Sequence, residues 1–234
     1  MTPHSDATEV DDASYIADDW HRCQALERLV NHWNRPGWVD GGRSYHWLLS
    51  FRNQPEVRAL AARCQAHLED FRTLDLVPIA SLHVTALRAG FTDEMSRAEA
   101  EAVAEAVSKR CATLAPMTLR VGPLAGSAGA VRFSAGPHEP VRRVLAELRA
   151  AMADVRGTEA PPDQPHPFIP HVSIAYSNTD MLAGPVIERV AALRELGFTT
   201  TRVDCVDLVE LRREGRSYAW DTLSQVEFAQ AIHP

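Results

Sequence analysis

The sequence lacks any apolar run long enough to cross a bilayer, which takes about 20 residues. It also lacks the marks of a signal peptide, because its first residues, MTPHSDATEVDDAS, have neither a basic start nor an apolar stretch. We therefore expect a cytoplasmic protein that does not bind membranes. The hydrophobic content of 45% is ordinary for a globular protein with a substantial core.

Cysteines are few and widely spaced along the chain, at Cys23, Cys64, Cys111 and Cys205. No CxxC pair or similar cluster brings them together as metal ligands, so we expect reduced and mostly buried thiols. A zinc site could use His166 and His171, but no cysteine, aspartate or glutamate stands at a matching spacing. The sequence therefore predicts neither a metal nor another cofactor.

Lysine occurs only once, and the net charge is −7. Much of the negative charge lies in six acidic residues that precede the first arginine, Arg22: Asp6, Glu9, Asp11, Asp12, Asp18 and Asp19. The remaining body is close to neutral, which argues against a broad basic face for long double-stranded nucleic acid. It is compatible with a small nucleotide or an RNA end held by a few local arginines.

Three segments are expected along the chain. Residues 1–13 are polar and acidic, which predicts a flexible tail. Apolar residues recur at helical spacing over 14–34, which predicts a helical extension at 14–40 that docks on the body. Residues 41–234 form the remaining single domain, and we expect a monomer.

Within this domain, helices and strands are predicted in an order typical of an α+β fold. Strands are expected at 45–51, 74–88, 117–124, 130–135 and 171–177, with a closing hairpin over 205–228. Helices are expected at 57–71, 92–113, 141–155 and 186–193. Thr92 is a plausible N-cap of the second of these helices. The order strand, helix, strand, helix occurs at 45–113 and again at 129–196, which suggests two similar lobes.

Two short stretches, SLHVTALR and PHVSIAYS, each place a histidine two residues before a hydroxyl side chain. With ten histidines in the chain, about one such match is expected by chance, so the count alone means little. Because side chains alternate along a strand, His83 and Thr85 share one face, and His171 and Ser173 share one face of theirs. Alternation places Tyr176 on the opposite, apolar face and turns Arg88 away from His83 unless the strand bends.

Two such pairs that face each other across a cleft could catalyse phosphoryl transfer without a metal. The pKa of imidazole is about 6.5, so one histidine can act as a base while the other is protonated and acts as an acid. A hydroxyl about 7 Å along the strand can donate a hydrogen bond to a phosphate oxygen between them. The alternative interpretation is that each histidine is structural, which is the favoured interpretation for His46 because nothing pairs with it.

The stretches LHVTALRAGFTDE and FIPHVSIAYS resemble the two motifs of the 2H phosphoesterase family, which includes bacterial RNA 2′,5′-ligase-like proteins and cyclic nucleotide phosphodiesterases. The resemblance covers roughly residues 45–226. It implies a bilobal fold in which two antiparallel sheets, related by a pseudo-twofold axis, face a shared cleft with helices on their outer faces. It also implies that His83 and His171 are the acid and the base, in either order, and that Thr85 and Ser173 bind phosphate.

The function implied is a metal-independent phosphoesterase that hydrolyses, or forms in reverse, a 2′,3′-cyclic or 2′,5′-linked phosphodiester of a nucleotide or RNA end. Arg132 alternates with apolar neighbours and could contact substrate or lie at the surface. Phe168 could stack on a base or pack the proline-rich loop at 159–170. A module that binds nucleotides or RNA with little catalysis is the alternative function. The N-terminal extension could also lie across the cleft or recruit a partner.

Overall fold

The computed structural model describes residues 6–35, 38–157 and 168–229, with side chains from residue 14 onward. The helices are α1 (Asp6–Gln24), α2 (Pro55–Ala66), α3 (Arg97–Cys111), α4 (His138–Arg156) and α5 (Gly184–Leu193). The strands are β1 (Arg28–Leu29), β2 (Arg43–Ser50), β3 (Leu74–Leu76), β4 (His83–Phe91), β5 (Met117–Ser127), β6 (Ala130–Gly136), β7 (His171–Ser177), β8 (Met181–Leu182), β9 (Thr199–Val203), β10 (Cys205–Glu214) and β11 (Ser217–Glu227).

These strands form two main antiparallel sheets and one small ribbon. The four-stranded sheet has the order β11-β10-β2-β4, and the five-stranded sheet has the order β3-β7-β6-β5-β9. The ribbon joins β1 to β8. The two histidine-bearing strands, β4 and β7, approach each other at the junction of the sheets, with Cα atoms within 8 Å. The predicted α+β fold with two antiparallel sheets is therefore confirmed.

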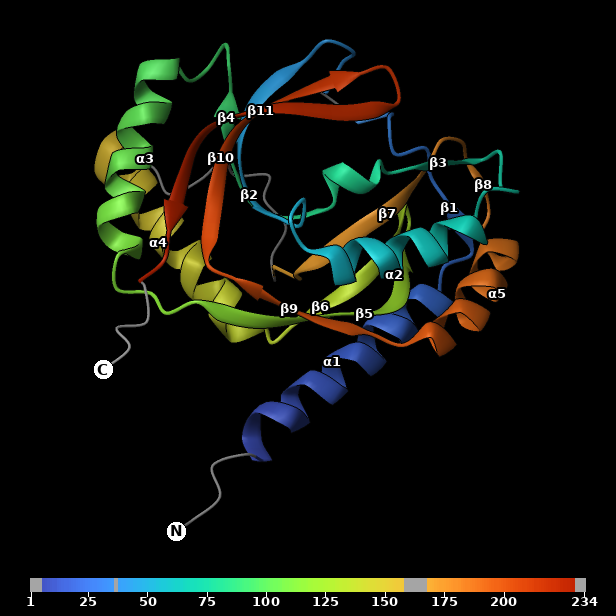
Figure 1. Cartoon of the computed structure of the whole chain (residues 1–234). Helices are drawn as coiled ribbons and strands as arrows, with labels where there is room; N and C mark the ends of the chain where they lie inside the picture. Colours follow the sequence, from blue (N-terminus) through green and yellow to red (C-terminus); the bar gives the residue numbers. More distant parts are fainter. Residues whose placement is uncertain (1–5, 36–37, 158–167, 230–234) are drawn as a thin grey trace.

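The predicted internal repetition is present in the order of the elements. The sequence β2-α2-β4-α3 in the first half corresponds to β6-α4-β7-α5 in the second. In each half the histidine-bearing strand pairs antiparallel with the strand that precedes the helix of this repeat, β4 with β2 and β7 with β6. Helices α3 and α4 pack against each other beside the four-stranded sheet, and α2 and α5 lie beside the five-stranded sheet (Figure 1).

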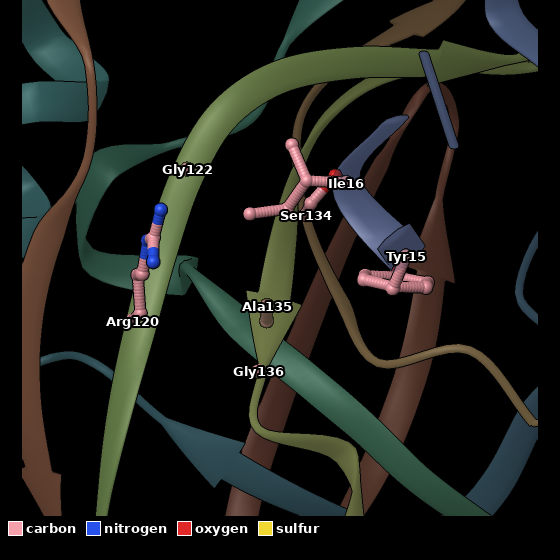
Figure 2. Close-up of a pocket in the computed structure, with 7 residues that line it drawn as sticks. All are labelled: Tyr15, Ile16, Arg120, Gly122, Ser134, Ala135 and Gly136. Atoms are coloured by element: carbon pink, nitrogen blue, oxygen red, sulfur yellow. The ribbon is translucent and has the colours of Figure 1, made fainter. Parts of the chain in front are cut away.

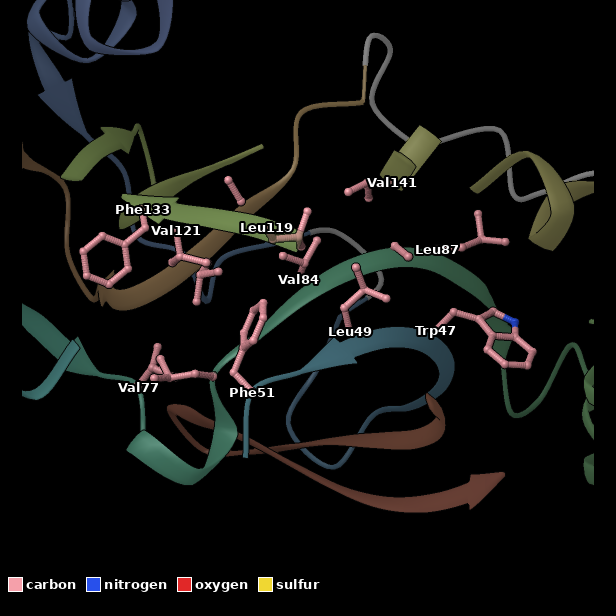
Figure 3. Close-up of a cluster of buried hydrophobic side chains, with 14 of the residues drawn as sticks. Trp47, Leu49, Phe51, Val77, Val84, Leu87, Leu119, Val121, Phe133 and Val141 are labelled. Carbon is pink, nitrogen blue, oxygen red and sulfur yellow. The ribbon is translucent and has the colours of Figure 1, made fainter. Parts of the chain in front are cut away.

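A single large core joins the two lobes. Apolar side chains from both sheets meet there, and the largest fully buried ones include Trp47, Phe51 and Phe133 (Figure 3). The four cysteines are free, and all except Cys205 are buried, as the sequence predicted. Because apolar burial contributes about 25 cal/mol per Å², this shared core makes the two lobes one cooperative unit. No helix among residues 6–35, 38–157 and 168–229 is long and apolar enough to span a membrane.

Several predicted boundaries are corrected. The strand expected at 74–88 is split into β3 and β4 by a short 3-10 helix at Ile79–Ser81, which follows Pro78. Strand β4 runs on to Phe91, so α3 starts later than expected, and its N-cap is Ser96 instead of Thr92. The Ser96 hydroxyl accepts a hydrogen bond from the Glu99 amide, and the Glu99 carboxylate accepts one from the Ser96 amide, which is a complete capping box.

The N-terminal extension differs most from its prediction. Helix α1 begins at Asp6, within the acidic segment assigned to a tail, and it ends at Gln24 instead of near Asn34. The chain then forms β1 and runs beside the end of the five-stranded sheet, where the His32 amide donates to the Ser177 carbonyl. Trp33 and Trp38 are buried beyond this point. The segment after Gln24 is thus extended because it binds sheet edges and aromatic side chains of the body.

A buried ion pair holds α1 against the five-stranded sheet. Asp19 is fully buried, and its carboxylate accepts hydrogen bonds from Arg132 Nη2 (2.5 Å) and from the Ser134 hydroxyl (2.7 Å), both on β6. The helix comes very close to β5, because a Cβ at Gly126 would lie 3.0 Å from the Cys23 Sγ. A buried carboxylate is stable only when its charge is paired and hydrogen-bonded, as it is here.

A small pocket lies where α1 meets the sheet. Tyr15 and Ile16 of α1 face Ser134 of β6 across it, and Arg120 of β5 completes its side (Figure 2). The Tyr15 hydroxyl donates to the Pro170 carbonyl, immediately before the histidine of β7. Helix α1 therefore contacts the same end of the sheet that carries the second histidine motif.

We expect the substitution Asp19→Ala to lower the free energy of unfolding by about 3–5 kcal/mol, because it leaves the guanidinium of Arg132 buried without its counter-charge. Chemical denaturation followed by circular dichroism measures the change. Asp18→Ala is the matched control, since Asp18 is exposed on the same helix and its removal should change stability by less than about 0.5 kcal/mol. Equal stabilities of the two variants would contradict the assignment.

Candidate active site

The two motif histidines have the same local geometry. In each ring Nδ1 lies 2.8 Å from the carbonyl oxygen two residues earlier, Ser81 for His83 and Ile169 for His171. A carbonyl can only accept, so Nδ1 carries the proton in the neutral ring, and Nε2 keeps the lone pair. The repeated contact fixes both ring orientation and tautomer, which is the usual preparation of an acid–base histidine.

The structure brings the two histidines close enough to interact electrostatically. The pKa of His171 is lowered to about 4 by burial first, then by the positive charge of Arg132, with a smaller contribution from His83; Asp19 and the bond to the Ile169 carbonyl act in the opposite direction. Burial also lowers the pKa of His83, and its bond to the Ser81 carbonyl opposes this. Both rings are therefore biased toward the neutral form before a phosphate is bound.

A β-bulge follows each hydroxyl residue and changes which side chains share the face of the histidine. Thr85 pairs with Leu48 and Leu87 with Trp47, so Ala86 is an extra residue in β4. In β7, Ser173 pairs with Arg132 and Ala175 with Val131, so Ile174 is the corresponding extra residue. Because one extra residue reverses the alternation, each side chain beyond the bulge lies on the face opposite to the one that regular alternation predicts.

The bulge in β7 corrects the predicted orientation of Tyr176. Its phenol interacts with the Ser173 hydroxyl and is stacked by the His32 ring at 3.9 Å between centroids, so it lies on the face of His171 and not on the apolar face. The Ile174 carbonyl of the bulge accepts bonds from the Val77 amide and the Gln65 side chain. Alternation in the sequence missed Tyr176, and no turn residue marks the bulge.

The bulge in β4 likewise corrects the predicted orientation of Arg88. Arg88 pairs with His46 across the strands, lies with its guanidinium 4.6 Å from the Phe91 ring centre, and contributes to the low pKa of His46. Arg88 therefore shares the face of His83 and Thr85, which strict alternation had excluded. Arg88 and Tyr176 occupy equivalent places in the two halves, each three residues after the motif hydroxyl.

A shallow pocket opens beside His83. Its aromatic wall is made by Tyr176 of one sheet and by Tyr218 and Trp220 of the other. The Trp220 ring meets the His83 ring nearly at right angles, with 5.2 Å between centroids. Arg216 stands at the rim and is largely exposed, and its guanidinium forms an ion pair with Asp75 at 3.7 Å. Such a pocket suits a phosphate attached to a flat, apolar group.

A family model described as the 2'-5' RNA ligase superfamily matches residues 59–212, more than half of the chain and both motifs. The chain belongs to this superfamily. The predicted relationship to the 2H phosphoesterases is thereby confirmed. No curated protein sequence matches the chain.

Solved structures of members show the same fold. TT0787 of Thermus thermophilus aligns with a TM-score of 0.63 at 20% identity, covering 80% of this chain and 99% of that one. Escherichia coli LigT complexed with phosphate aligns with a TM-score of 0.58 at 12% identity, covering 82% and 100%. LigT complexed with 3'-AMP gives 0.59 at 13% identity, covering 81% and 99%. In each case about a fifth of this superfamily member lies outside the alignment.

The structure places the other predicted residues less favourably. Arg132 is only 7% exposed and its guanidinium binds Asp19, so it is not a surface residue and its charge is already paired. Phe168 packs against the main core, which favours the packing alternative over stacking on a base. Of the proline-rich loop, residues 159–167 lie outside the described part of the chain. Thr85 is exposed and Ser173 is partly exposed, which suits groups that bind an incoming phosphate.

His46 fits its predicted structural role. Its Nδ1 lies 3.1 Å from the Ser44 hydroxyl, and burial first and Arg88 second lower its pKa to about 3. Among the described residues, no three side chains of histidine, cysteine, aspartate or glutamate lie together in a way that could hold a metal ion. His166, which the sequence offered together with His171 for a zinc site, lies outside the described residues.

These shifts make stability depend on pH. The pKa values of His46 and His171 lie below the unfolded value of about 6.5, so the unfolded chain binds protons more readily as the pH falls. We expect the free energy of unfolding to fall from about pH 6.5 toward pH 4, by up to about 1.4 kcal/mol per pH unit for each histidine. Denaturant titrations at successive pH values measure it. His46→Gln should flatten the slope, whereas the same change at the exposed His67 should not; equal slopes in both variants would contradict the assignment.

Proposed function

We propose that the protein is a metal-independent phosphoesterase that hydrolyses, or forms in reverse, a 2′,3′-cyclic or 2′,5′-linked phosphodiester in a nucleotide or RNA end. The observation that carries the proposal is the pair of histidines on β4 and β7, strands of different sheets that approach each other, each with Nδ1 bound to the carbonyl two residues earlier. Each is followed by a hydroxyl on the same face, and an aromatic pocket adjoins one of them. Superfamily membership supports the same chemistry.

The two histidines differ in a way that suggests their roles. Arg132 lies close enough to His171 to oppose a second positive charge there, and no arginine contributes to the shift of His83. We assign His171 as the base and His83 as the acid for hydrolysis. His171 Nε2 takes a proton from water, the water oxygen attacks phosphorus, and His83, in its doubly protonated form, gives the Nε2 proton to the departing ribose oxygen. In the ligation direction each ring takes the opposite role.

The hydroxyls complete the site. Thr85 and Ser173 donate hydrogen bonds to the nonbridging phosphoryl oxygens, where negative charge grows in the transition state. The pocket is small, and the nearly neutral surface offers no track for a long duplex, which supports a mononucleotide or a chain terminus as the substrate.

We expect His83→Ala or His171→Ala to lower kcat by about 10²–10⁴-fold on 2′,3′-cyclic nucleotides, because each removes one proton transfer. The pH profile of the wild type should be bell-shaped, and turnover should persist with a chelator present. His67→Ala is the matched control and should keep full activity, since this histidine is exposed on the far end of α2. Full activity in either site variant would refute the proposal.

Substrate choice is tested in the same assay. A screen of 2′,3′-cyclic nucleotides, 2′,5′-linked dinucleotides and cyclic-phosphate RNA ends should give turnover with at least one class, and loss of turnover in the double variant His83→Ala/His171→Ala. Tight binding of these compounds by the wild type without any product would instead support the alternative, a nucleotide- or RNA-binding module.

A further inference from the structure

Tyr218 lies between the pocket and the N-terminal extension. Tyr218 belongs to β11 and lines the pocket together with His83 and Tyr176. The Tyr218 hydroxyl oxygen lies 2.9 Å from His32 Nε2, and the same hydroxyl forms a hydrogen bond with the Trp38 side chain. Both partners belong to the extension, outside the part of the chain that the family model matches.

The protonation state of His32 follows from its second contact. Its Nδ1 lies 3.2 Å from Nη2 of Arg35, and a guanidinium can only donate, so Nδ1 accepts. Burial, together with the charges of Arg35 and Arg213, lowers the pKa of His32 to about 3, so the ring is neutral. A neutral ring that accepts at Nδ1 carries its proton at Nε2. His32 Nε2 therefore donates to the Tyr218 oxygen.

The Tyr218 oxygen thus accepts two hydrogen bonds. The indole of Trp38 has only a donor, and His32 donates from Nε2. A phenol has two acceptor sites and one proton, so that proton must be donated elsewhere. Within residues 14–35, 38–157 and 168–229, no side chain or carbonyl accepts it. A buried or half-buried donor without a partner is rare, and the residue that carries this one lines the pocket.

We propose that Tyr218 donates its hydroxyl proton to an anionic oxygen of the substrate phosphate bound beside His83, and that His32 is a positioning residue that orients this hydroxyl. The inference rests on the proposed function for the identity of the ligand. It adds a third hydroxyl donor to Thr85 and Ser173. It also gives the N-terminal extension a role in substrate binding, because only the extension supplies the two donors that fix the direction of the phenol.

The phenol is suited to this role across the working pH range. Burial raises the pKa of Tyr218, and the neighbouring Arg35, Trp38 and Arg213 oppose this only in part. The group therefore keeps its proton where the histidines titrate. It stabilises bound phosphate without taking part in proton transfer.

The decisive variant is Tyr218→Phe, which removes only the hydroxyl. We expect kcat/KM for a 2′,3′-cyclic nucleotide to fall by about 10- to 100-fold, because a hydrogen bond to a charged group is lost. The pH limits of the profile should not move, since both titrating groups remain. Tyr45→Phe is the matched control: Tyr45 is a buried tyrosine of β2 outside the pocket, and its kcat/KM should match the wild type.

Variants of His32 test the orientation. His32→Phe keeps a ring against Tyr176 but removes the donor, and should lower kcat/KM several-fold. His32→Gln offers an amide donor near the position of Nε2 and should restore most of this loss. A purely structural role of His32 predicts the reverse order, because the aromatic replacement fills the same space and the amide does not. That order would overturn the positioning role.

Binding of inorganic phosphate, measured by calorimetry, separates this inference from the proposed function. If the wild type binds phosphate and Tyr218→Phe binds it about 10-fold or more weakly, the inference holds even when no substrate is turned over. If Tyr218→Phe matches the wild type in both phosphate binding and kcat/KM while His83→Ala is inactive, the inference is wrong and the proposed function stands. A wild type that binds no phosphate also overturns the inference.

Discussion

The site depends on an irregularity in hydrogen-bond register that directly follows the motif hydroxyl in each half of the protein. A regular strand would turn every second residue toward the cleft, so the histidine and the hydroxyl of each motif would be followed there by Leu87 or Ala175. The extra residues Ala86 and Ile174 reverse that alternation directly after the motif. As a result Arg88 lies on the same face as His83, and Tyr176 lies on the same face as His171. The first half thus adds a cation and the second half a phenol. The two strands are therefore nearly symmetric in backbone geometry, but the side chains that they bring to the site differ.

The N-terminal extension is held against the two sheets by charged and polar side chains that would be costly to bury without a partner. Asp19 neutralises Arg132 on the face of the five-stranded sheet that also carries His171, and it thereby moderates the positive field at that histidine. Further along, Trp33 donates from its indole to Asp75 and packs against both Tyr176 and Tyr218. The extension touches both sheets, so it belongs to the architecture of the cleft and not to its periphery.

Much of this arrangement could be predicted from the sequence, and the failures share one cause. Periodicity located the strands and helices of the body, and the two motifs pointed to His83 and His171, because these signals are local. The bulges could not be predicted, since neither Ala86 nor Ile174 is a typical bulge residue and the register depends on the partner strand. Arg132 was judged on alternation alone, and its pairing with Asp19, far away in the sequence, was invisible. The helix expected over residues 14–34 failed because its aromatic residues bind the body instead of lining one helix face.

The order of strands in the sheets has a consequence for how the chain folds. The four-stranded sheet combines β2 and β4 from the first half of the chain with β10 and β11 from its end, and the five-stranded sheet is built mainly from the segment between them. Neither lobe is a continuous piece of sequence, so neither can be excised, and the four-stranded sheet cannot be completed during synthesis before β10 and β11 emerge. Pairings of such wide sequence separation fold slowly, because loop closure precedes most of the stabilising contacts. The histidine-bearing strands β4 and β7 therefore reach their final relation only when the closing hairpin has docked.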